Sequence, residues 1–67
     1  MNTFKKEHVQ AAGGLQPLAA TLGVRYQAIQ AWLRRGRVPA ERVIAIERAT
    51  GVPRTTLRPD IYPEERA

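Results

Sequence analysis

Between residues 25 and 35, the sequence RYQAIQAWLRR carries polar and basic side chains at spacings that place them on one side of a helix. Arginine can hold O6 and N7 of guanine, glutamine can pair with N6 and N7 of adenine, and alanine can contact the thymine methyl group. Tyrosine can stack on a sugar, donate to a phosphate or contact a methyl group. This combination predicts DNA base contacts from five residues: Arg25, Tyr26, Gln27, Gln30 and Ala31.

A second group of donors suits the DNA backbone rather than the bases. Arg34, Arg35 and Arg37 follow at the far end of the same helix and in the loop after it. Arginines there can hold phosphates and add affinity and salt dependence rather than sequence choice. Gln16 lies near the start of the preceding helix, where backbone N–H groups without helical partners also suit a phosphate. Taken singly, polar residues on a helix such as that over residues 25–35 usually belong to a solvated face.

The positive charge of the chain is concentrated around these residues. The 67 residues include 11 Lys and Arg against 6 Asp and Glu, a net charge of +5. Residues 25–42 contain five arginines and one glutamate, a net charge of +4, whereas residues 58–67 contain two arginines and three carboxylates, a net charge of −1. A domain this basic favours a polyanionic partner, with the field centred on residues 25–35.

Two short helices, over residues 15–22 and 25–35, are predicted to position the candidate readers. Glycine between them allows the positive φ with which chains often leave a helix. Apolar residues three apart keep one face of the second helix buried. The pattern predicts a helix-turn-helix, whose second helix enters the major groove of DNA. It rests on small and apolar residues that would pack at the crossing: Ala19, Gly23, Val24, Ile29 and Trp32.

Helices are also predicted on both sides of this pair. The first covers residues 3–12 and is capped by Thr3. One face of this helix is expected to contain Phe4, His8, Ala11 and Ala12. A fourth helix over residues 39–50 begins at Pro39, because proline is tolerated in a first helical turn. Its apolar stripe is expected to contain Val43, Ile46 and either Ala49 or Thr50.

Three prolines, at positions 53, 59 and 63, limit the C-terminal part to one helical turn over residues 54–57. Arg42 and Arg48 are expected to pair with neighbouring glutamates. We therefore predict an all-α fold, a compact bundle of four to five helices in one domain over residues 1–62, followed by a frayed tail over residues 63–67. Three apolar residues are expected to pack back onto the bundle: Val52, Leu57 and Ile61.

The composition argues against catalysis and cofactors. The chain has no Ser or Cys, a single His and a single Asp, so it lacks the usual nucleophile, base and metal-ligand combinations. We expect no enzyme activity, no cofactor and no metal site. The first residues have no apolar run typical of a signal peptide, and no window approaches the roughly 18 apolar residues of a membrane span. The sequence predicts a soluble, cytoplasmic protein without a membrane partner.

Two blocks of the chain resemble the Cro/YdaS-type helix-turn-helix proteins of bacteriophages and prophages. They read GGLQPLAATLGVRYQAIQAWLRRG and VPAERVIAIERATG, the second being the more specific, and the resemblance covers roughly residues 10–62. It implies a lambda-repressor-like helical bundle that binds operator DNA, with base-reading positions on Arg25, Tyr26, Gln27, Gln30 and Ala31. The chain is without the β-strand tail through which some Cro proteins dimerise, so a homodimer is expected to be weak or to form on DNA.

Two functions are compatible with this resemblance. The first is a sequence-specific transcriptional repressor of phage or prophage genes, associated with the nucleoid of a bacterial host. One monomer would bind each half of a partly palindromic site, with recognition helices about 34 Å apart. The second is an antitoxin whose main partner is a protein toxin, bound through the fourth helix or the proline-rich tail.

Overall fold

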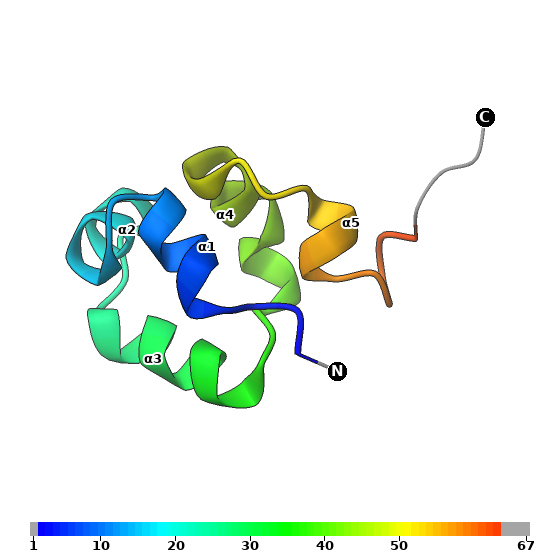
Figure 1. The fold of residues 1–67 in the computed structure, drawn as a ribbon, viewed down its shortest axis with the longest axis horizontal. Helices are drawn as coiled ribbons and strands as arrows, with labels where there is room; N and C mark the ends of the chain where they lie inside the picture. The colour runs from blue at the N-terminus through cyan, green and yellow to red at the C-terminus, as the bar shows by residue number, and fades with distance from the viewer. Residues whose placement is uncertain (1, 64–67) are drawn as a thin grey trace.

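The computed structural model describes residues 2–63. This part of the chain contains no strand and forms the helices shown in Figure 1: α1 (Lys6–Ala11), α2 (Leu15–Leu22), α3 (Tyr26–Arg35), the 3₁₀ helix η1 (Ala40–Arg42), α4 (Val43–Thr50) and α5 (Arg54–Leu57). The predicted all-α bundle is confirmed. The single domain over residues 1–62 stays a prediction, and the predicted frayed tail lies outside the described residues except for Pro63.

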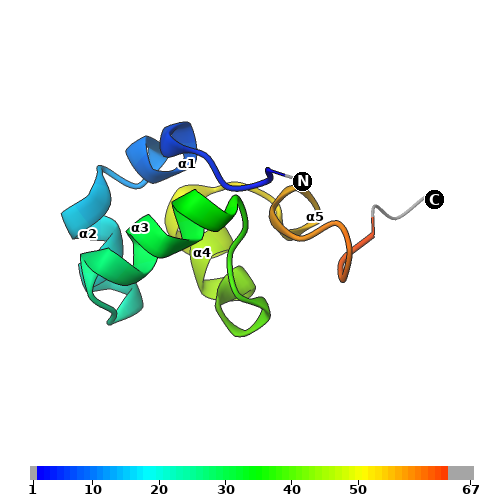
Figure 2. The same cartoon turned by 90° about the horizontal axis from the view of Figure 1, so that it is seen from below.

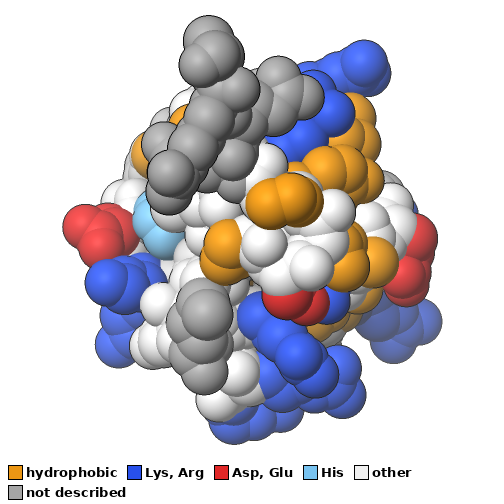
Figure 3. Space-filling model, turned by 90° about the vertical axis from the view of Figure 1, so that its right-hand side faces the viewer, with side chains coloured by type: hydrophobic (Ala, Val, Ile, Leu, Met, Phe, Trp, Pro, Cys, Tyr) orange, Lys and Arg blue, Asp and Glu red, His pale blue; other side chains and the backbone are white. Residues whose placement is uncertain are grey.

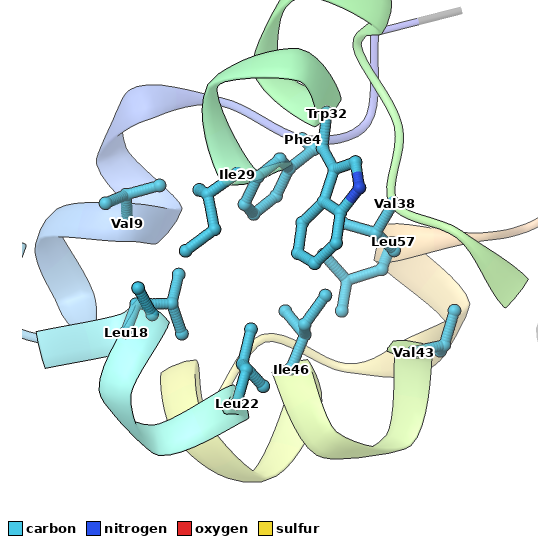
Figure 4. Close-up of a cluster of buried hydrophobic side chains, with 11 residues drawn as sticks. Phe4, Val9, Leu18, Leu22, Ile29, Trp32, Val38, Val43, Ile46 and Leu57 are labelled. Atoms are coloured by element: carbon cyan, nitrogen blue, oxygen red, sulfur yellow. The ribbon is translucent and has the colours of Figure 1, made fainter. Parts of the chain in front are cut away.

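All five α-helices contribute to one hydrophobic core. Figure 4 shows Ile29 and Trp32 pointing from α3 into the space between α2 and α4, and Trp32 is only 7% exposed. The predicted burial of Ile29 and Trp32 on one face of α3 is therefore confirmed. The buried hydrophobic side chains are Phe4, Val9, Leu18, Ala19, Leu22, Ile29, Trp32, Val38, Val43, Ile46 and Leu57.

The turn between α2 and α3 has the geometry that the sequence predicts. Gly23 adopts φ +69°, and its N–H donates to the carbonyl of Ala20 at 3.3 Å. The N–H of Val24 donates to the carbonyl of Ala19 at 3.0 Å, which closes the end of α2, and Val24 packs half-buried against the core. These two hydrogen bonds form a Schellman motif, which satisfies carbonyl groups that the helix leaves unpaired. The turn thereby sets the direction in which α3 leaves.

The N-terminal segment differs from the prediction, because α1 begins at Lys6 rather than at Thr3. The N–H groups of Thr3 and Phe4 both donate to the carbonyl of Gly36, at 2.6 and 3.1 Å. The hydroxyl of Thr3 donates to the carbonyl of Leu57 at 2.6 Å, so it does not cap α1. Phe4 is fully buried. Residues 2–4 therefore run outside the helix as a segment, here called the N-terminal strap, that joins the end of α3 to α5.

The predicted buried face of the first helix is also wrong in part. Val9 is buried, whereas Ala11 is exposed and Ala12 is half-buried. The prediction counted helical positions from Phe4, which lies before the helix, so the periodicity was displaced. His8 is half-buried and its ring stacks on Phe4 with centroids 6.1 Å apart. Its Nδ1 accepts a hydrogen bond from the N–H of Lys5 at 3.1 Å, which helps begin α1.

The predicted fourth helix over residues 39–50 is correct only in part, because the 3₁₀ helix η1 occupies its start and α4 begins at Val43. Pro39 has an extended backbone (φ −65°, ψ 146°) and precedes η1, so it does not lie in the first turn of α4.

The rest of the C-terminal half largely follows the prediction. Val43 and Ile46 are buried in α4, α5 is the predicted single turn, and Leu57 is buried while Val52 packs half-buried against the core. Ile61 is different, because 43% of it is exposed. After α5 the chain turns, so that Tyr62 packs against the core in its place, with the guanidinium of Arg54 5.7 Å from the centre of its ring.

The prediction that Arg42 and Arg48 pair with neighbouring glutamates is wrong for the described residues. Glu47 instead pairs with Arg54 at 3.2 Å and accepts a hydrogen bond from its backbone N–H at 2.9 Å. The guanidinium of Arg42 reaches the carbonyl of Leu22 at 3.4 Å, near the end of α2. The carboxylate of Glu47 thus holds the first turn of α5 against α4.

Candidate nucleic-acid interface

Helix α3 lies along the lower edge of the molecule in Figure 1 and faces the viewer in Figure 2, where the molecule is seen from below. Its period of 3.6 residues divides the helix into an inner and an outer side. Ile29 and Trp32 are buried on the inner side, whereas Gln27, Gln30 and Arg34 are exposed on the outer side. The outer side is therefore a row of hydrogen-bond donors on a helix whose other side is packed into the core.

The five predicted base-contacting residues have different degrees of exposure. Arg25, the N-cap residue with an extended backbone (φ −81°, ψ 148°), is exposed, as are Gln27 and Gln30. Tyr26 and Ala31 are half-buried, and Tyr26 packs against the core. The structure therefore brings three long polar side chains together along the first two turns of α3, with Tyr26 at the border between surface and core.

The four predicted phosphate-contacting residues are all exposed: Gln16, Arg34, Arg35 and Arg37. Figure 3 shows that Lys and Arg side chains gather along the lower edge of the molecule, the side on which α3 lies in Figure 1. Arg35 and Arg37, together with Arg58, line a hollow of about 250 Å³ beside the loop after α3. Gln16 lies in the first turn of α2, where the N–H groups have no partner within the helix.

Arg58 has a role that the sequence analysis did not predict. One nitrogen of its guanidinium donates to the carbonyl of Val38 at 2.8 Å, and the other two donate to the carboxylate of Asp60 at 3.0 and 2.8 Å. The hydrogen bonds from Arg58 lower the pKa of Asp60 to about 2. Hydrogen bonding to Asp60 in turn raises the pKa of Arg58. Arg58 thereby anchors the loop that follows α3.

The carboxylate of Asp60 also affects Arg37. Arg37 lines a hollow of about 210 Å³ together with Arg58 and Asp60, and its charge contributes to the lowered pKa of Asp60. A nearby carboxylate partly cancels the attraction of an arginine for phosphate. Arg34 and Arg35 do not line this hollow with Asp60.

The model of the family described as "Bacterial toxin YdaS" matches residues 6–66, which is nearly the whole chain. The chain belongs to the YdaS family.

This YdaS-family protein is also similar to a solved structure, the Cro protein from the prophage element Xfaso 1 in Xylella fastidiosa strain Ann-1. The two share 46% sequence identity and a TM-score of 0.82, over 96% of this chain and 100% of the Cro protein. The predicted Cro/YdaS resemblance is therefore confirmed, and the α2–α3 pair is the helix-turn-helix of a Cro-like fold. No curated protein matches the chain.

Two further structural observations on this YdaS-family protein concern metal binding and membrane insertion. Within residues 2–63, no three His, Cys, Asp or Glu side chains lie close enough to hold a metal ion. The helices in the same range are too short or too polar to cross a membrane.

Sequence reasoning missed Arg58 for an identifiable reason. The spacing of Arg58 and Asp60 could have indicated their ion pair. The contact with the carbonyl of Val38, 20 residues earlier, depends on how the chain folds back.

Proposed function

We propose that this protein is a sequence-specific transcriptional repressor of phage or prophage genes that inserts α3 into the major groove of operator DNA. The outer side of α3 is the observation that carries the proposal. Gln27 and Gln30 are exposed there, with Ile29 and Trp32 buried behind them, and Arg25 is exposed at the N-cap position just before the helix. The similarity to a Cro protein over the full length of that protein supports it.

The dimensions of α3 and of DNA suit each other. An α-helix with its side chains is about 10–12 Å across, and the major groove is about 12 Å wide. Arg25, Gln27 and Gln30 would face base edges, with Tyr26 and Ala31 beside them. Gln16, Arg34, Arg35 and Arg37 would contact phosphates on either side. Such a repressor acts in the bacterial cytoplasm, on the nucleoid, and needs no catalytic step.

A partly palindromic operator would bind two copies, one for each half-site, with recognition helices about 34 Å apart. We propose that the homodimer is weak in solution or forms on DNA. Selection of bound duplexes from a random pool at near-physiological salt would test both specificity and symmetry. An inverted repeat among the selected sequences would support two bound copies, whereas a pool that stays random would contradict sequence-specific binding.

Alanine variants would then test the assignment of base readers. Arg25→Ala and Gln27→Ala should weaken operator binding by about 1–3 kcal/mol each, or roughly 5- to 150-fold, because each removes hydrogen bonds to a base. Binding to random duplex should change little. Arg48→Ala, which removes an exposed arginine from α4, is the control and should leave both affinities nearly unchanged. Equal losses on operator and random DNA would contradict base reading by α3.

A second candidate function is that of an antitoxin that binds a protein toxin. One observation favours it: a hollow of about 560 Å³ lies between α4, α5 and the following turn, and it is lined by the exposed Ile61 and the half-buried Tyr62. Co-expression with the product of a flanking gene, followed by co-purification, would test this function. A complex that Ile61→Asp abolishes would support it, and the absence of a complex with either neighbouring product would contradict it.

A further inference from the structure

A shallow hollow of about 210 Å³ lies beside the proposed recognition helix, between α1, the start of α2 and α3. Its apolar lining consists of Val9, Leu15 and Leu33, which are buried or half-buried. Its polar lining consists of three exposed side chains, Lys6, Gln10 and Gln30. The hollow therefore joins a proposed base reader of α3 to a cation and an amide of α1, and no carboxylate lines it.

The helical period of α1 explains why Lys6 and Gln10 face this hollow. Lys6, Val9 and Gln10 lie three and four positions apart, so they share one side of the helix. Val9 is 4% exposed and holds that side against the core. Lys5 is also exposed, but it precedes the first turn and does not line the hollow. Two neighbouring lysines thus have different surroundings.

We propose that Lys6 and Gln10 bind a phosphate of the DNA strand that passes beside α3, so that the interface extends onto α1. This proposal rests on the proposed function. Because an α-helix nearly fills the major groove, the phosphates that border the groove lie directly beside it. Gln30, which is predicted to reach a base edge, lines the hollow together with Lys6 and Gln10. Lys6 supplies positive charge and Gln10 supplies amide N–H donors.

Charge complementarity supports a phosphate as the occupant. Lys6 shares its hollow with no carboxylate, because the exposed Glu7 that follows it in the sequence does not line the hollow. A cation attracts an anion more strongly where no carboxylate lies between them. The hollow near Arg37 is different, because Asp60 lines it. Lys6 is therefore a candidate phosphate contact, and no carboxylate in its own hollow offsets its charge. The charge of Arg37, by contrast, is partly offset by Asp60.

The matched variants Lys6→Gln and Lys5→Gln test this proposal, since each removes one charge from an exposed side chain. The affinity of each variant for the selected operator and for random duplex would be measured across a range of salt concentrations. Lys6→Gln should reduce the slope of log Kobs against log salt by about 0.9 on both duplexes. The same relation gives about five-fold weaker binding at 0.15 M salt. Lys5→Gln should change the slope much less.

Gln10→Ala provides an independent readout, because it removes donors without changing charge. It should weaken binding to both duplexes while leaving the salt slope unchanged. Equal slopes for the Lys5 and Lys6 variants would overturn the proposal, since the effect would then be general electrostatic attraction, and the proposed function would stand. If the wild-type protein binds no duplex, the proposed function and its extension to α1 both fail.

Discussion

Two glycines in the same backbone conformation provide a test of how firmly the N-terminal strap is held. Gly23 and Gly36 have φ values of +69° and +78°. A Cβ atom added at Gly23 would meet nothing within 4 Å. A Cβ atom added at Gly36 would lie 3.1 Å from both the Cα and the Oδ1 of Asn2. Asn2 has little freedom to withdraw, because the next two residues both donate to the carbonyl of Gly36.

The two substitutions should therefore differ in cost. Left-handed backbone costs an L-residue about 1–2 kcal/mol, and this is the whole expected effect of Gly23→Ala. Gly36→Ala adds a steric term, for which overpacking gives about 1–3 kcal/mol. A domain of this size has a total stability of about 3–10 kcal/mol. Since 1 kcal/mol corresponds to about 4–8 °C in a small domain, Gly36→Ala should lower Tm by at least about 5 °C more than Gly23→Ala.

Urea denaturation and thermal melts followed by circular dichroism would measure both variants. The double variant Asn2→Gly with Gly36→Ala should recover part of the loss, because it removes the side-chain half of the contact. If Gly36→Ala is no more destabilising than Gly23→Ala, then the strap yields without cost and is not held against α3 as described.

Three other substitutions have definite expected outcomes. Trp32→Ala should cost about 3–5 kcal/mol by leaving a cavity in the core, which corresponds to a fall in Tm of at least about 12 °C; a cooperative melt near the wild-type Tm would contradict this. Thr3→Val should cost about 1–3 kcal/mol in urea denaturation, because the carbonyl of Leu57 loses its donor; an unchanged midpoint would show that this hydrogen bond contributes nothing. The lowered pKa of Asp60 means that its pairing with Arg58 stabilises the fold above about pH 4 and is lost as the pH falls toward about 2. Melts between pH 5 and 2 should therefore decline less steeply in Asp60→Asn than in the wild type, and parallel declines would refute that contribution.

The helix-turn-helix could be predicted from the sequence because its determinants are local. The N–H groups of Gly23 and Val24 end α2 by donating to carbonyls three and five positions earlier, respectively. The spacing of Ile29 and Trp32 defines the buried side of α3. The same helical period indicated which polar residues would be exposed. Base contact by these residues stays a prediction, because exposure alone does not identify a partner.

The N-terminal segment could not be predicted, because its partners are distant in the chain. Thr3 binds residues 33 and 54 positions away, and no periodicity within residues 1–12 contains that information. The surroundings of Lys6 could not be predicted for the same reason, because Gln30, which lines the same hollow, belongs to a different helix. At the C-terminus, the period of a helix does not extend through the turn after α5, so Tyr62 rather than Ile61 packs against the core.

The link between Thr3 and Leu57 also bears on how the protein is made. Translation proceeds from the N-terminus, so Thr3 leaves the ribosome while its acceptor, 54 residues later, has not yet been synthesised. Phe4 likewise emerges before most of the side chains that bury it. The nascent polypeptide must therefore wait, with an aromatic side chain uncovered, until almost the whole domain has been translated, and closure of the strap is a late event in its biogenesis.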